Sequence, residues 1–409
     1  MGESTLAVHD LSFVAEGADV VVGRLDTGSY AVFPADGAEL LRRLAEGMPL
    51  EGAEAWYEST FSESVDLDDF IDTLRELGFV REDTDAAANP GFAEERGARS
   101  AGTVRFQRLG RAVFSPLAWC CYAAVVAFWL VTLAHHSDLE PHPSQIFFTK
   151  SLLLVQVVIT FGQVPLLLLH EGFHILAGRR LGLPSRLRLS NRLTYIVAET
   201  QINGLMSVPP RKRYLPFLAG MACDVLVLSA LDLAADLGRD PGGRLSLSSR
   251  LCLALAFTVL MRILWQFQLY LRTDLFFVLA TAFNCYDLHD ASKAILKNRF
   301  WRLLRLNHRT VEENQWTERD RQVGVFYGPF LVLGFCVLAA ITVFVSFPVA
   351  LHYFGVAADS LGSGHINGRF WDAASSLCFN VAQVVALIVL SRRKRRQTSA
   401  QASVSGGGE

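Results

Sequence analysis

The spacing of apolar and charged positions divides the chain into two parts. Residues 1–100 mix the two kinds at ordinary density, whereas long stretches after Val113 carry almost no charge. A membrane-spanning helix needs about 20 apolar residues. Six stretches qualify, at roughly 113–134, 146–180, 213–238, 249–285, 323–349 and 370–391. The pattern predicts a polytopic α-helical membrane protein of about six spans, with a membrane domain over 111–391.

Two of these stretches are too long for one straight crossing. About 35 residues extend about 52 Å as a helix, against a hydrocarbon core of about 30 Å. Pro165 interrupts the second stretch, and residues 272–274 (Arg-Thr-Asp) interrupt the fourth. Broken helices are typical of membrane proteins at the point where they build a site. We therefore expect broken helices around a functional site.

Basic residues fall on one side of this predicted topology. Clusters of Arg and Lys precede spans one and three and follow spans two, four and six, whereas the loops 135–145 and 350–369 contain few; loop 239–248, with Arg239 and Arg244, is a mild exception. The positive-inside rule then places both termini in the cytoplasm and the protein in the cytoplasmic (inner) membrane. The run Arg392–Arg396 opens a polar tail, 392–409, and suits contact with anionic lipid of the bilayer.

Composition agrees with this division. Hydrophobic residues make up 51% of the chain and charged residues 19%, which argues against a single soluble globule and against a disordered chain. The net charge of −2 supplies no overall basic field, so no nucleic acid partner is expected.

Residues 1–82 form a separate cytoplasmic unit in this interpretation, followed by a linker over 83–110. Period-two and helical patterns predict a small α+β, winged-helix-like domain. Its expected elements are strands at 19–25 and 29–33, a turn at 26–28, and helices at 38–44, around Trp56 and Phe61, and at 67–77.

The segments LDTGSYAVF, DGAELLRRLAEG and LDDFIDTLRELGFV of this unit resemble the PqqD-like domain, also called the RiPP recognition element. The resemblance implies that the domain binds the leader of a precursor peptide as an added strand. It implies a peptide-binding edge at Ser29, Tyr30, Ala31, Val32 and Phe33, with the helix 67–77 as the other wall. The alternative is a generic winged-helix or regulatory domain without a peptide ligand.

The second apolar stretch contains the motif His170-Glu171-Gly172-Phe173-His174. Two His at i and i+4 lie on one helix face and can share a metal ion, and the Glu between them can accept a proton from water. Three ionisable groups in an apolar helix are costly unless they are functional. The alternative is a polar cluster that only forms hydrogen bonds within the helix bundle.

This motif supplies two ligands, and a catalytic zinc usually has three. Counted along helices from the cytoplasmic side, His170 lies about 14 Å deep, Asp224 about 17 Å and Asp274 about 20 Å, or less if its segment is broken. Asp224 and Asp274 are therefore both candidates by depth, and Asp232 ranks third.

The segments LLLLHEGFHILAGRRLGLP, LAGMACDVLVL and LRTDLFFVLATAFNCYDLHDA resemble the site-2 protease family of intramembrane zinc metalloproteases. The resemblance implies a Zn²⁺ held by His170, His174 and Asp274, with Glu171 as the catalytic base. Leu275 replaces the Gly that follows the family's Asp. Asp224 replaces the Asn of a Gly-x-x-x-Asn motif, so it is either a substrate-orienting group or an alternative ligand.

The segment that follows the zinc motif has strand character at 187–189 and 193–197, with a turn at Ser190 and Asn191. In the resembling family such a segment can align an extended substrate; the alternative is a plain cytoplasmic loop.

Three functions are consistent with these features. The first is a zinc-dependent intramembrane endopeptidase that processes a ribosomal precursor peptide captured by the N-terminal domain. The second is regulated intramembrane proteolysis of a membrane-anchored regulator; the absence of a recognisable PDZ or nucleotide-sensing domain favours the first. The third is a non-catalytic immunity or transport relative, against which the intact Glu171 argues.

Overall fold

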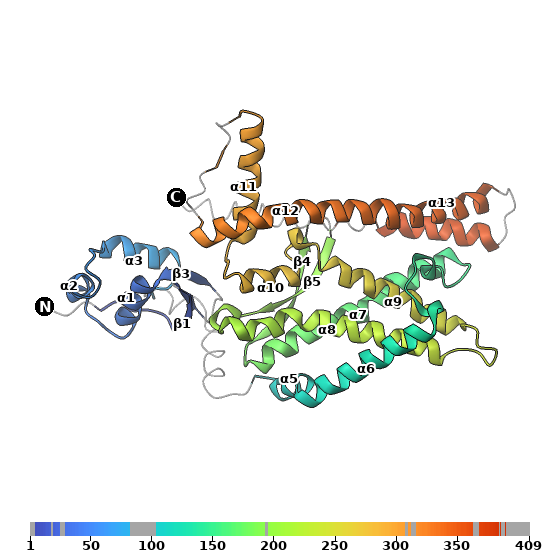
Figure 1. The fold of residues 1–409 in the computed structure, drawn as a ribbon, viewed down its shortest axis with the longest axis horizontal. Helices are drawn as coiled ribbons and strands as arrows, with labels where there is room; N and C mark the ends of the chain where they lie inside the picture. Colours follow the sequence, from blue (N-terminus) through green and yellow to red (C-terminus); the bar gives the residue numbers. More distant parts are fainter. Residues whose placement is uncertain are drawn as a thin grey trace.

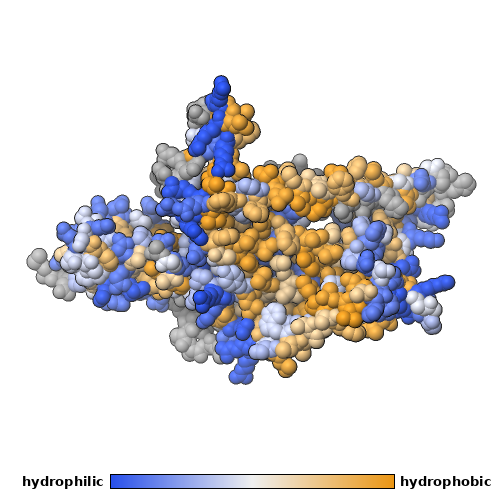
Figure 2. All heavy atoms as spheres, viewed as in Figure 1, coloured by the Kyte–Doolittle hydropathy of each residue, from blue (hydrophilic) through white to orange (hydrophobic). Residues whose placement is uncertain are grey.

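The computed structural model describes residues 5–17, 19–24, 29–81, 104–192, 195–306, 310–311, 316–362, 368–383, 385 and 389. Most of them are helical, and long helices run side by side along the longest axis of the molecule (Figure 1). Hydrophobic side chains gather over the middle of these helices, and hydrophilic ones cover the two ends and the N-terminal unit (Figure 2).

The N-terminal unit combines a three-stranded antiparallel sheet with three helices. The sheet has the order β1-β2-β3. Its elements are β1 (Leu11–Glu16), β2 (Asp19–Arg24), β3 (Tyr30–Pro34), α1 (Ala35–Ala45), α2 (Leu50–Phe61) and α3 (Leu67–Glu76). Both predicted strands and all three predicted helices are confirmed, while β1 was missed. The predicted turn at 26–28 lies outside the described residues.

One face of the sheet packs against α1 and α3. Phe33 of β3 is buried with Leu41 of α1 and Leu74 of α3. Asp66 caps α3 by accepting a hydrogen bond from the main-chain N–H of Asp69 at 3.1 Å, as its acidic start predicts. These contacts leave β3 as one edge of the sheet, because within the described residues it pairs only with β2.

Five helices of the described chain are long and apolar enough to cross a membrane. They are α6 (Pro116–His135), α7 (Leu152–Arg180), α8 (Pro210–Leu237), α9 (Leu247–Trp265) and the run that begins with α12 (Glu318–Ile341). A shorter helix, α5 (Gln107–Val113), precedes α6 and includes the last positions assigned to the linker. The linker residues 83–103 and the tail 392–409 lie outside the described part.

The two long apolar stretches differ in how they are built. In the stretch 146–180, residues Leu152–Arg180 form one helix, α7, which continues through Pro165 without a break. The stretch 249–285 is divided: α9 ends at Trp265, a 3₁₀ turn η5 (Leu269–Leu271) follows, and α10 (Asp274–Ala282) begins at the expected interruption. The prediction of broken helices is thus confirmed for the second case only.

The C-terminal part corrects one expectation. The segment 350–369, expected as an outside loop, is helical as far as Gly362, because α12 continues through a π-helical turn (Thr342–Ser346) into α13 (Phe347–Gly362). No Pro follows Pro348 before the Gly-rich polar run that begins at Gly362. Residues 368–383 form a further helix. The described part holds five candidate spans, and the sixth predicted span, 370–391, lies partly outside the described residues.

A β-hairpin connects α7 to α8. Strands β4 (Ser185–Arg192) and β5 (Tyr195–Ile202) confirm the predicted strand character of this segment. The turn is not at Ser190 and Asn191: both lie within β4, where they pair with Val197 and Ile196. The ladder extends to Arg192 and Tyr195 instead, and half of the residues of β5 are β-branched, as is typical of strands. The predicted strand residues Leu193 and Thr194 lie outside the described part.

A buried ion pair joins the N-terminal unit to the helical part. Glu16, at the end of β1, accepts a hydrogen bond from the Arg213 guanidinium in the first turn of α8, and Arg213 is 1% exposed. Tyr286 donates a second hydrogen bond to Glu16 at 2.7 Å. Ser12 of β1 also donates to Ser207 at 2.6 Å. Ser12 and Glu16 of β1 thereby fix the sheet to the helical part, and β3 makes none of these three hydrogen bonds.

This interface predicts a large stability effect of Glu16→Gln. Removing one charge of a buried ion pair leaves the other uncompensated, at a cost of roughly 3–5 kcal/mol. We expect a clearly lower melting temperature, measured by tryptophan fluorescence of the purified chain. Asp72→Asn, which breaks the exposed Asp72–Arg75 pair, is the control, with an effect below about 1 kcal/mol. Equal melting of Glu16→Gln and wild type would contradict the role of this pair.

Candidate metal centre

Helix α7 carries the paired histidines and the glutamate between them. His170 and His174 are one helical turn apart, so their side chains leave the same face of α7. Their exposed fractions are 4% and 6%, and that of Glu171 is 6%. The helix therefore buries three ionisable groups together, as the sequence predicts.

Helix α10 brings Asp274 to the two histidines because the chain breaks before it. The side chain of Gln266, just after α9, accepts a hydrogen bond from the main-chain N–H of Asp274 at 3.1 Å. Thr273 donates to the main-chain carbonyl of Gln266 at 2.6 Å. Arg272 lies in the left-handed region at φ 54°, which allows the tight turn. Gln266 thus fixes the first residue of α10.

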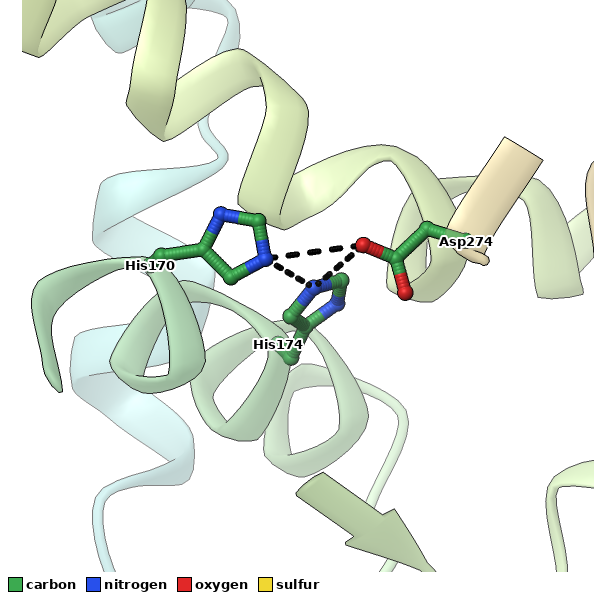
Figure 3. A group of neighbouring side chains, drawn as sticks. All are labelled: His170, His174 and Asp274. Atoms are coloured by element: carbon green, nitrogen blue, oxygen red, sulfur yellow. Dashed lines mark hydrogen bonds and ion pairs between the residues drawn. The ribbon is translucent and has the colours of Figure 1, made fainter. Parts of the chain in front are cut away.

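Figure 3 shows His170, His174 and Asp274 directed toward one point. The two Nε2 atoms are 3.2 Å apart, and Asp274 Oδ2 lies 3.5 Å from His170 Nε2 and 3.3 Å from His174 Nε2. Three corners of a tetrahedron with metal–ligand bonds of about 2.0–2.1 Å are about 3.3–3.4 Å apart. The donor set therefore fits a tetrahedrally coordinated divalent metal ion with one position left open.

The far nitrogen of each imidazole is held by an acceptor from α8. His170 Nδ1 lies 3.0 Å from Asp224 Oδ2, and His174 Nδ1 lies 2.7 Å from the main-chain carbonyl of Pro216. Since both acceptors need a proton on Nδ1, the Nε2 lone pairs are free to face the metal position. Both rings are thus held in the tautomer that a metal ligand requires.

Gly220 of α8 provides the space beside these ligands. A Cβ at this position would lie 2.2 Å from His174 Nε2 and 2.5 Å from His170 Nε2. No side chain fits there without displacing both rings. A glycine is therefore required for α8 to approach the metal position this closely.

Glu171 is oriented by the hairpin. Thr200 of β5 donates its hydroxyl hydrogen bond to Glu171 Oε2 at 2.7 Å. The same hydroxyl lies 3.1 Å from the main-chain carbonyl of Glu171. The strand that follows α7 thereby contacts the carboxylate next to the metal ligands.

Asp224 and Asp232, the other two candidates for the third ligand, do not join the two histidines. Asp224 is fully buried on the Nδ1 side of His170, away from the three converging ligand atoms, and Arg262 of α9 binds it through two hydrogen bonds, of 2.5 and 3.0 Å. Asp232 accepts a hydrogen bond from Trp129 at 2.8 Å. Of the three, Asp274 alone joins the two histidines.

The predicted peptide-binding residues lie on the edge strand of the N-terminal sheet. Ser29 directly precedes β3 and accepts a hydrogen bond from the Arg24 N–H at 2.8 Å. Hydrogen-bonded pairs alternate in an antiparallel ladder, so Ala31 and Phe33 face β2. Tyr30 and Val32 therefore direct their main-chain N–H and C=O groups to the outer edge. The Phe33 side chain, 7% exposed, belongs to the core and cannot contact a peptide.

Sequence reasoning missed Arg262, Thr200 and Gln266. Arg262 was detectable in principle, because a charge in the apolar stretch that follows Arg250 signals a buried partner. Thr200 and Gln266 carry no such signal, since their roles arise only from tertiary contacts.

Comparison of the chain with protein-family models, with curated proteins and with solved structures gives no match. The two family resemblances therefore stay predictions, and the geometry of the site carries the functional proposal.

The space at Gly220 gives a test of the metal centre. We expect Gly220→Ala to abolish metal binding, because its Cβ would occupy the space next to both Nε2 atoms. Gly172→Ala is the matched control: it lies inside the motif, and its added Cβ meets no atom within 4 Å. Metal content after reconstitution with Zn²⁺ is measured by atomic emission. Full metal content in Gly220→Ala would contradict the geometry.

Proposed function

We propose that the chain is a zinc-dependent endopeptidase of the cytoplasmic membrane, with His170, His174 and Asp274 as metal ligands and Glu171 as catalytic base. The observation that carries this proposal is the convergence of three ligand atoms from two helices, with a carboxylate beside them. Two imidazoles and one carboxylate with an open fourth position are typical of catalytic zinc. A purely structural zinc site would be closed by a fourth protein ligand.

Several groups of the chain have separate roles in the proposed peptide hydrolysis. A bound zinc ion supplies the Lewis acidity that activates water and polarises a carbonyl at neutral pH. Glu171 accepts the proton of the attacking water and passes it to the nitrogen of the leaving amine as the C–N bond breaks. Thr200 holds one oxygen of Glu171, so the other is available for this transfer. Asp224 and Pro216 keep the imidazoles oriented.

The surrounding helices support an intramembrane location. All three ligands lie on helices of the bundle whose middle is hydrophobic (Figure 2), and α7, α8 and α9 have the length of membrane spans. We place both termini in the cytoplasm by the positive-inside rule, with the helix 368–383 as part of the sixth span predicted at 370–391, because an even number of spans returns the chain to the same side. A helical substrate has to unwind before cleavage, because its carbonyls are otherwise hydrogen-bonded.

The free edge of β3 supports a peptide substrate captured by the N-terminal domain. Among the described residues, no strand pairs with the outer main-chain groups of Tyr30 and Val32, and an extended peptide can add there as a fourth strand. We therefore propose that a ribosomal precursor peptide binds β3 through its leader and is cleaved at the metal centre.

Glu171→Gln tests the catalytic proposal. The amide cannot accept a proton, so we expect hydrolysis of fluorescein-labelled casein, an unfolded protein, to fall by about 10²–10⁴-fold. Zinc content should stay at the wild-type level because Glu171 is not a ligand. Wild-type hydrolysis by this variant would exclude Glu171 as the base. Zinc binding without any hydrolysis by the wild type, on casein or on a membrane-anchored peptide, would favour the non-catalytic alternative.

Val32→Pro tests the peptide-binding edge. It removes one outward N–H but none of the bonds to β2, and Pro is tolerated on edge strands. The probe is a fluorescent peptide selected from a random-sequence display library for binding to the purified full chain. We expect its binding, measured by fluorescence anisotropy, to weaken at least about tenfold. Val32→Thr keeps the N–H and should bind as wild type; equal loss in both, or in neither, would argue against strand addition.

A further inference from the structure

A buried ion pair, Asp224–Arg262, lies behind His170, and neither residue is a metal ligand. Asp224 is fully buried on α8, and Arg262 enters the bundle from α9. The guanidinium donates from Nη2 to Asp224 Oδ1 at 2.5 Å and from Nε to Oδ2 at 3.0 Å. Burying such a pair is costly, and the rest of the mechanism uses Arg262 nowhere.

We infer that Asp224 and Arg262 act as one positioning unit, which orients His170 and raises the affinity of the site for its metal ion. The inference rests on the proposed metal centre and adds a function for residues that do not touch the metal. Asp224 Oδ2 lies 3.0 Å from His170 Nδ1, on the opposite side of the ring from the converging Nε2. A carboxylate in this place fixes the ring, selects the Nδ1–H tautomer and makes Nε2 a better donor to metal.

Arg262 compensates the negative charge of the buried Asp224 carboxylate. Asp274 and Glu171 together carry two negative charges, which a divalent ion balances. A third carboxylate beside them would add an uncompensated negative charge to a buried site. The two-point contact with Arg262 neutralises Asp224 and also fixes the direction of its oxygens. The site thereby gains an ionic partner for His170 while its total charge, with the metal, stays at zero.

The two histidines consequently differ. His170 has a charged acceptor, whereas His174 has the neutral carbonyl of Pro216. Loss of Asp224 should therefore weaken the site through His170 alone. Outer partners of metal-bound histidines typically contribute 10–100-fold to metal affinity, and we expect an effect in this range.

The test compares Asp224→Asn, Arg262→Gln and the double variant with wild type, all as full chains in detergent. Zn²⁺ affinity is measured by competition with a chelator, and the visible absorption of bound Co²⁺ reports the ligand geometry. Asp232→Asn is the matched control, because Asp232 is equally buried on α8 but bonds to Trp129 and not to a ligand. We expect Asp224→Asn to bind Zn²⁺ about 10–100-fold more weakly with an altered Co²⁺ spectrum, and Asp232→Asn to match wild type.

The double variant separates positioning from stability. Each single variant leaves a buried group without its partner, so both should melt at lower temperature. The double variant removes both charges, so its melting temperature should recover while its Zn²⁺ affinity stays low. Recovery of affinity together with stability would overturn the inference, as would wild-type affinity in Asp224→Asn. In both cases the metal centre would stand; a wild type that binds no metal would remove the proposed function as well.

Discussion

The placement of charge inside an apolar helix bundle is the constraint on which the rest of this molecule depends. An isolated ion costs far more in such surroundings than the few kcal/mol by which a protein is stable. Each buried ionisable group near the site accordingly has a partner. Asp224 has Arg262, His170 has Asp224, and Glu171 has Thr200. Among the described residues, the two Nε2 atoms and one oxygen of Asp274 face a common point, where they could hold a metal ion.

This constraint explains the break between α9 and α10. A continuous helix through residues 265–274 would satisfy its backbone but could not present Asp274 to α7 from its first turn. Hydrogen bonds of Gln266 and Thr273 instead stabilise the break, and Arg272 adopts a left-handed backbone conformation. The hydrogen bonds of the break replace those of the lost helical turn, as apolar surroundings require. Irregular backbone is thus confined to the place where it contributes a ligand.

The parts of the site that depend on local patterns were predictable from the sequence. The spacing of His170 and His174 follows from helix periodicity, and the polar interruption at 272–274 marked the break that carries Asp274. Motif resemblance, rather than depth, favoured Asp274 over Asp224. Depth along a helix could not separate them, because it contains no information on which nitrogen of His170 each carboxylate would face.

The rest depends on contacts between residues far apart in the chain. Arg262 meets Asp224 across 38 positions, and Glu16 meets Arg213 across 197. Strand β1 was missed because LSFVAE alternates only weakly and becomes a strand by pairing with β2. The helical continuation to Gly362 was missed because 350–369 was assigned as the loop between two predicted spans, although its Gly-rich polar run begins only at Gly362.

Helix α8 connects these features in a fixed order. Arg213, Pro216, Gly220 and Asp224 follow one another at spacings of three, four and four residues, and therefore line one face of the helix. This face extends over about 16 Å. Arg213 binds the N-terminal domain, and the Pro216 carbonyl contacts His174. Gly220 leaves space at the candidate metal position, and Asp224 contacts His170. A helix of 28 residues does not stretch, so the β-sheet is held at a constant distance from the metal position. Under the proposed function, the protein and not the peptide would determine the distance between the segment bound at β3 and the cleaved bond.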